Sequence, residues 1–108
     1  MTFNEYQELA KSTAIYPDTV RLIYPVLGLC GESGEVAEKV KKLFRDSKGE
    51  ITPEFKENLK KELGDVLWYL AAVSSDIGLN LGEVAQANYE KLKDRKERNM
   101  IHGSGDNR

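Results

Sequence analysis

The chain has 108 residues, one cysteine and a formal net charge of -2, from 16 basic and 18 acidic residues. This length fits one small domain, and the balanced charge gives no reason to expect a nucleic-acid partner. A single cysteine excludes an intrachain disulfide, so we expect Cys30 to be a small core residue of a cytoplasmic protein in a reducing compartment. With no signal-peptide pattern and no apolar stretch of membrane-spanning length, no membrane partner is expected.

The first half of the chain predicts two helices. The first covers about residues 3 to 14, where Thr2 and Glu5 have the spacing of a capping box. The second is long and covers about residues 24 to 46. Pro25 fits its first turn, where a missing backbone N–H costs nothing.

The second half predicts two more helices. Thr52 and Pro53 have the residue types of an N-cap and a first helical position, and Gly78 suits the end of this third helix. Asn80 caps a fourth helix that extends to about Arg98. We therefore expect one all-α domain over residues 1–100, resembling a four-helix bundle, and a flexible tail over residues 101–108.

The third predicted helix is apolar almost all round. Projection at about 100° per residue gives one core stripe, formed by Leu59, Leu63, Val66, Leu70, Val73 and Ile77. Trp68, Ala71 and Ser75 fall on the opposite side. A helix of this kind is usually buried on both sides. In so short a chain the second side would be buried by another copy, so we expect a homo-oligomer.

Two pairs of acidic residues lie along the edges of apolar stripes. Glu32 with Glu35, and Glu62 with Asp65, have i, i+3 spacing, so the members of each pair face one way. If the two helices lie side by side, four carboxylates converge and repel one another unless a cation binds among them. Oxygen ligands of this type suit Mg²⁺, with Mn²⁺ as a second possibility.

Other observations leave alternatives open. Gly28, Gly31 and Gly34 each cost roughly 1 kcal/mol inside a helix, which indicates either close helix packing or room for a ligand. Acid pairs are also common on solvated helices, so a non-catalytic helical oligomerisation module with an acidic face is the alternative function. A di-iron carboxylate site is disfavoured because the chain has no Glu-x-x-His motif.

Three segments resemble the MazG-like nucleoside triphosphate pyrophosphohydrolases, an all-α superfamily marked by Glu-x-x-Glu, a spacer and Glu-x-x-Asp. They are residues 27–38, which contain Glu32 and Glu35, residues 61–70, which contain Glu62 and Asp65, and residues 87–92 with Arg95. The resemblance implies Mg²⁺-dependent hydrolysis of a nucleoside triphosphate between the α- and β-phosphates, giving a nucleoside monophosphate and pyrophosphate. It also implies a dimer or a tetramer.

The resemblance and the helical placement together give candidate site residues. The four acids would hold Mg²⁺, and Glu32 or Glu35 would act as general base, with no choice between them. Tyr69, one turn after Asp65, would contact the nucleoside. The candidates for phosphate binding are Lys39, Asn88, Lys91 and Arg95. The base and sugar of the substrate are not fixed by these residues.

Overall fold

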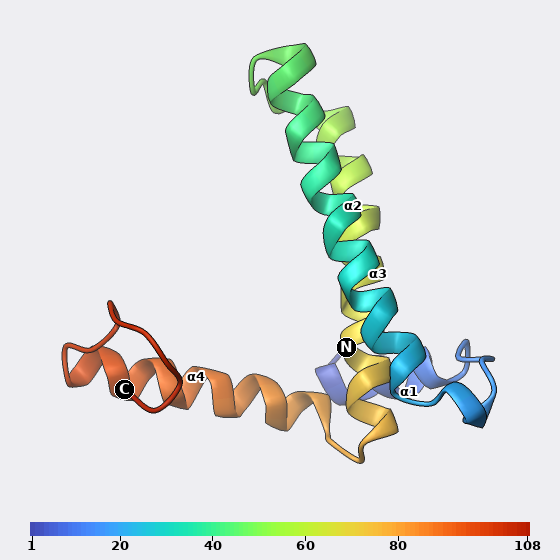
Figure 1. Cartoon of the computed structure of the whole chain (residues 1–108), viewed down its shortest axis with the longest axis vertical. Coiled ribbons are helices and arrows are strands. Elements are labelled where there is room, and N and C mark those ends of the chain that lie inside the picture. The colour runs from blue at the N-terminus through green and yellow to red at the C-terminus, as the bar shows by residue number, and fades with distance from the viewer.

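Four α-helices and one short 3₁₀ helix make up the fold of the computed structural model, which describes residues 1–108 (Figure 1). In chain order they are α1 (Phe3–Lys11), η1 (Asp18–Val20), α2 (Ile23–Ser47), α3 (Pro53–Asp76) and α4 (Leu81–Glu97). The all-α prediction and its four helices are confirmed. None of the helices combines the length and apolarity needed to cross a lipid bilayer.

The predicted starts of α1, α3 and α4 are confirmed by the hydrogen bonds of their caps. At α1, the Glu5 amide donates to Thr2 Oγ1 and the Thr2 amide donates to Glu5 Oε1, each at 3.0 Å. At α3, Thr52 Oγ1 accepts from the Phe55 amide at 3.1 Å. At α4, Asn80 Oδ1 accepts from the Gly82 amide at 3.2 Å. Local side-chain chemistry therefore sets where these helices begin.

The end of α1 lies earlier than the sequence predicted. The hydroxyl of Ser12 donates to the Leu9 carbonyl at 2.5 Å, and that of Thr13 donates to the Ala10 carbonyl at 2.9 Å. Side chains that bond to the last carbonyls in this way compete with continuation of the helix. The segment that follows is an irregular connection to η1 and α2.

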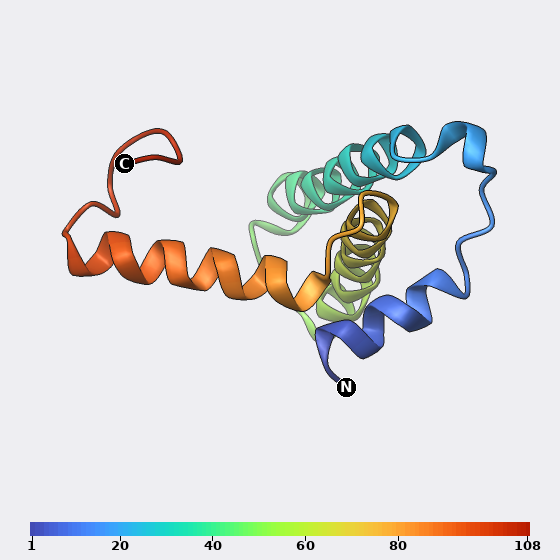
Figure 2. The same cartoon turned by 90° about the horizontal axis from the view of Figure 1, so that it is seen from below.

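The long helices α2 and α3 form an antiparallel hairpin, α1 packs across α3, and α4 projects away from the hairpin (Figures 1 and 2). The turn from α3 to α4 contains Gly78 at φ +73°, a conformation that favours glycine. The small core at this junction comprises Ala10, Ala71 and Leu81, with Tyr6 and Trp68 packed against it.

Gln7 fixes the start of α4 against α1. Its side chain is buried, and Oε1 accepts from the Leu81 amide at 2.8 Å. Its Nε2 donates to the Leu79 carbonyl at 2.9 Å and to Ser75 Oγ at 3.1 Å. The side-chain amide of Gln7 thereby pairs with backbone groups of the turn between α3 and α4, which would otherwise lack hydrogen-bond partners.

The predicted core stripe of α3 is wrong for three of its six residues in a single chain, whereas Leu59, Val66 and Val73 are partly buried. Leu63, Leu70 and Ile77 are 51%, 41% and 51% exposed, whereas Ala71 on the opposite side is 1% exposed. Ala71 is buried because α1 packs against that side of α3, whereas Leu63, Leu70 and Ile77 stay open to solvent. Cys30 is likewise exposed, so its expected core position is also wrong.

Candidate metal centre

Three of the four predicted carboxylates meet between α2 and α3. Oxygen atoms of Glu32 on α2 and of Glu62 and Asp65 on α3 all lie within 4.8 Å of one another. Glu32 and Glu62 are partly buried and Asp65 is exposed. We call these three residues the acid triad. The i, i+3 spacing on α3 and the side-by-side packing of the hairpin are what bring them together.

The acid triad carries more negative charge than its surroundings offset. Partial burial raises the pKa of Glu32, and the nearby charges of Asp65, Glu62 and Glu35 raise it further. The nearest opposing charge is Lys39, whose Nζ lies 3.8 Å from Glu62 Oε1. Like charges at this separation make the ionised state of Glu32 less favourable than that of an isolated glutamate.

This donor set fits a hard divalent cation. All three ligands are carboxylate oxygens, which suit Mg²⁺ and Mn²⁺, and no thiol or imidazole lies among them. Mg²⁺ typically binds one or two protein carboxylates and keeps waters for a phosphate substrate. Glu32, Glu62 and Asp65 are therefore the residues that would hold it.

Glu35 lies outside the acid triad. It is exposed on α2, one turn after Glu32, and acts on Glu32 through its charge. Its predicted roles as ligand and catalytic residue stay predictions.

An open cleft of about 360 Å³ adjoins the acid triad, lined by Thr13, Glu32, Asp65, Trp68 and Tyr69. The Trp68 and Tyr69 rings are perpendicular, with an interplanar angle of 87° and 5.0 Å between ring centroids. Trp68 Nε1 donates to Thr13 Oγ1 at 2.7 Å, which holds the indole against the end of α1. Thr13 was not among the residues predicted from the sequence, and Trp68 was predicted only for the face opposite the stripe, at a contact with another subunit. No local pattern marks a contact between residues this far apart in the chain.

Gly28 gives Tyr69 its place in this cleft. A Cβ atom at Gly28 would lie 2.1 Å from Tyr69 Cε1, so only glycine lets the ring lie against α2. At Gly31 and Gly34 an added Cβ would meet nothing within 4 Å. Of the two readings of the glycines, close packing therefore applies to Gly28, and open space surrounds the other two.

The basic candidates fall in two places. Lys39 lies beside the acid triad, whereas Asn88, Lys91 and Arg95 lie on α4, which points away from the hairpin (Figure 1). Asn88 and Lys91 line a separate open pocket of about 560 Å³ at the base of α4. The cleft beside the acid triad includes no residue of α4. One chain therefore does not bring the α4 candidates to its own acid triad.

Comparison with known proteins adds two findings. The sequence model described as the MazG nucleotide pyrophosphohydrolase domain matches residues 25–100, which include both acid pairs and the three α4 candidates. The "Gene 37 protein" of Mycobacterium phage L5 is 49% identical over 109 residues, covering 95% of this chain and 96% of that protein. No solved structure matches the chain.

Proposed function

Because the chain belongs to the MazG nucleotide pyrophosphohydrolase family, we propose that it hydrolyses a nucleoside triphosphate between the α- and β-phosphates. The products are a nucleoside monophosphate and pyrophosphate. The observation that carries this proposal is the acid triad beside an aromatic cleft: three carboxylates within 4.8 Å and, next to them, Trp68 and Tyr69. A location in the cytoplasm, where nucleoside triphosphates are available, accompanies the proposal.

Glu32, Glu62 and Asp65 hold Mg²⁺, or Mn²⁺ in its place, in this proposal. When bound, the ion would offset phosphate charge and lower the pKa of a bound water. The triad is supported as its binding site by the oxygen-only donor set and by the unfavourable charge of Glu32 among Asp65, Glu62 and Glu35.

The proton of the attacking water passes to a carboxylate. Glu35 is the first candidate, because it stands outside the triad and keeps its carboxylate free for general-base catalysis. Glu32 is the second, because its carboxylate lines the cleft beside the triad. Replacing each by glutamine distinguishes them: loss of the base lowers kcat, while loss of a ligand also weakens Mg²⁺ binding.

The nucleoside and the phosphates contact different elements. Tyr69, with Trp68 as the adjoining wall, receives the nucleoside, since aromatic faces stack on any base. Lys39 binds phosphate beside the acid triad. Because α4 projects from its own hairpin, its phosphate-binding residues act at the triad of a second copy, in a dimer or tetramer. These residues are Asn88, Lys91 and Arg95.

The test is a panel of ribo- and deoxyribonucleoside triphosphates incubated with the protein and Mg²⁺, with detection of pyrophosphate. Glu62→Gln and Asp65→Asn should abolish its release. Glu57→Gln is the matched control, because Glu57 is an exposed acid of the same helix paired with Lys60 at 3.6 Å. Release of single phosphate instead of pyrophosphate contradicts α–β cleavage. Absence of hydrolysis with every nucleotide, together with indifference to Mg²⁺, favours the non-catalytic oligomerisation module.

A further inference from the structure

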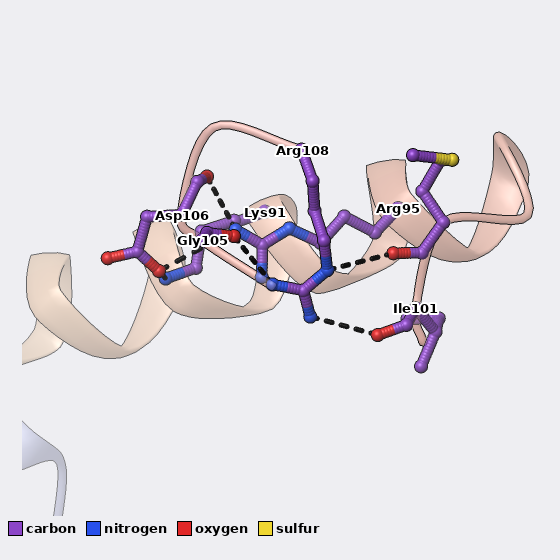
Figure 3. Close-up of polar contacts among 7 residues, drawn as sticks. Lys91, Arg95, Ile101, Gly105, Asp106 and Arg108 are labelled. Carbon is purple, nitrogen blue, oxygen red and sulfur yellow. Dashed lines mark hydrogen bonds and ion pairs between the residues drawn. The ribbon is translucent and has the colours of Figure 1, made fainter. Parts of the chain in front are cut away.

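The residues after α4 fold into a closed loop against that helix. The guanidinium of Arg108 donates to the carbonyls of Met100 at 3.1 Å, Ile101 at 2.9 Å and Gly105 at 2.6 Å (Figure 3). Gly105 has a φ of +83°, which lets the chain reverse. These bonds tie both ends of residues 100–108 together. We call this segment the C-terminal strap.

The strap places one carboxylate beside two basic side chains of α4. Asp106 Oδ1 lies 3.2 Å from Lys91 Nζ and 3.6 Å from Arg95 Nη2, and Arg95 also donates to the Asp106 carbonyl at 2.5 Å (Figure 3). Lys91 foremost, and then Arg95, holds the pKa of Asp106 below its usual value. Arg95 is only 4% exposed, whereas the Asp106 side chain is 84% exposed.

We propose that the C-terminal strap is an internal competitor, whose Asp106 carboxylate occupies the Lys91–Arg95 pair until a polyphosphate displaces it. The proposal rests on the proposed function in one respect, the assignment of Lys91 and Arg95 to phosphate. A carboxylate and a phosphate present similar oxygen pairs to a guanidinium. Both cannot occupy the same two cations, because their negative charges repel.

While the strap lies on α4, Arg95 is buried and Asp106 pairs with its guanidinium. A buried guanidinium without a partner is unfavourable, so the strap keeps Arg95 satisfied while no substrate is bound. The exposure of Asp106 explains why the strap can leave. The Lys91–Asp106 pair is open to solvent on both sides, so it is screened and contributes little, and a multiply charged anion replaces it readily. Phosphate binding then exchanges one anion for another and frees the strap.

The test measures anion binding without turnover. Tripolyphosphate is titrated calorimetrically into the full chain with the divalent metals chelated, so that the acid triad does not contribute. Asp106→Asn should raise the affinity about threefold to tenfold, the range expected for losing the ion pairs of Asp106 with Lys91 and Arg95. Asp94→Asn is the matched control. Asp94 is an exposed acid of α4 that pairs with Arg98 at 2.9 Å, and its loss should change the affinity by less than about twofold.

Arg108→Gln separates competition from simple charge. This change removes a positive charge, so general electrostatics predicts weaker tripolyphosphate binding. The strap predicts stronger binding, because the loop that places Asp106 opens. Weaker binding by this variant, or an unchanged affinity of Asp106→Asn, overturns the proposal.

The amide signals of Gly103 and Gly105 give an independent readout by nuclear magnetic resonance. Displacement predicts that they become mobile as tripolyphosphate is added, whereas increased order would show a strap that closes over the anion and would overturn competition. Failure of this proposal is distinct from failure of the proposed enzyme. Pyrophosphate release by a protein whose Asp106→Asn and Arg108→Gln variants bind like wild type rejects the strap alone. Tighter tripolyphosphate binding by both variants without any hydrolysis rejects only the enzyme.

Discussion

Replacing Gly28 by alanine tests how Tyr69 is held beside the acid triad. The new Cβ would lie 2.1 Å from Tyr69 Cε1 and 2.4 Å from Cζ, so the ring or α2 must shift. Overpacking of this kind typically costs about 1–3 kcal/mol. Alanine in a helix interior regains about 1 kcal/mol relative to glycine. The net expectation is a loss of stability of up to about 2 kcal/mol.

Gly31→Ala is the matched control on the same helix. Nothing lies within 4 Å of a Cβ at Gly31, so this variant keeps the helix gain without a clash. The difference between the two variants cancels the propensity contribution and leaves the packing cost of about 1–3 kcal/mol. For a small domain this corresponds to a difference in Tm of about 4–8 °C per kcal/mol.

The assay is thermal and urea unfolding followed by circular dichroism, without added metal. A Tyr69→Ala background completes the design, because removing the ring should make Gly28→Ala as harmless as Gly31→Ala. Equal Tm shifts for the two single variants would refute the packing argument. So would an undiminished cost of Gly28→Ala in the Tyr69→Ala background. A loss of stability in Gly31→Ala would show that a second copy packs where one chain leaves open space.

Three further expectations concern stability. Gln7→Leu should lower the free energy of unfolding in urea by about 1–3 kcal/mol, because the buried Leu81 amide at the start of α4 loses its acceptor. Gln86→Leu, at an exposed hydrogen bond, should lower it by under about 0.5 kcal/mol. Mg²⁺ should raise the Tm of the wild type in a calorimetric scan and leave that of Asp65→Asn unchanged. Burial, and then a hydrogen bond to the Asp76 carboxylate at 2.8 Å, raises the pKa of Tyr16 to about 12. Its contribution to stability is thus complete below pH 10 and lost as the pH rises towards 12. Tyr16→Phe should lower stability at pH 8 by about 1 kcal/mol and flatten this alkaline loss in pH-dependent urea unfolding.

Local chemistry explains which features could be predicted from the sequence. The caps at Thr2, Thr52 and Asn80 depend on neighbours within three residues, and all three form as predicted. The meeting of Glu32 with Glu62 and Asp65 follows from helical spacing and a short loop that forces the two helices to pack side by side. In each case the interacting groups lie close in the chain or are fixed by one hairpin.

The remaining features depend on contacts that spacing does not encode. Periodicity gives the relative rotation of residues on α3, but not which side finds a covering helix. For this reason Ala71 is buried while Leu63 is open. The hydrogen bond between Trp68 and Thr13 joins residues 55 positions apart, and no sequence pattern near either residue predicts it. Asp106 likewise meets Lys91 only because the chain reverses after α4.

The exposed residues of the α3 stripe lie close to the acid triad in the chain, which links self-association to completion of the site. Leu63 follows Glu62 directly in α3, and Leu70, a further exposed residue of the stripe, directly follows Tyr69. Helices in contact pack about 8–10 Å apart. A second copy that covers Leu63 and Leu70 therefore comes within about one helix width of the acid triad. We therefore expect that the same association of two copies buries the stripe and brings the basic residues of one α4 to the acid triad of the other copy. Leu63→Lys should consequently weaken self-association and pyrophosphate release together, while leaving the unfolding of a dilute single chain nearly unchanged.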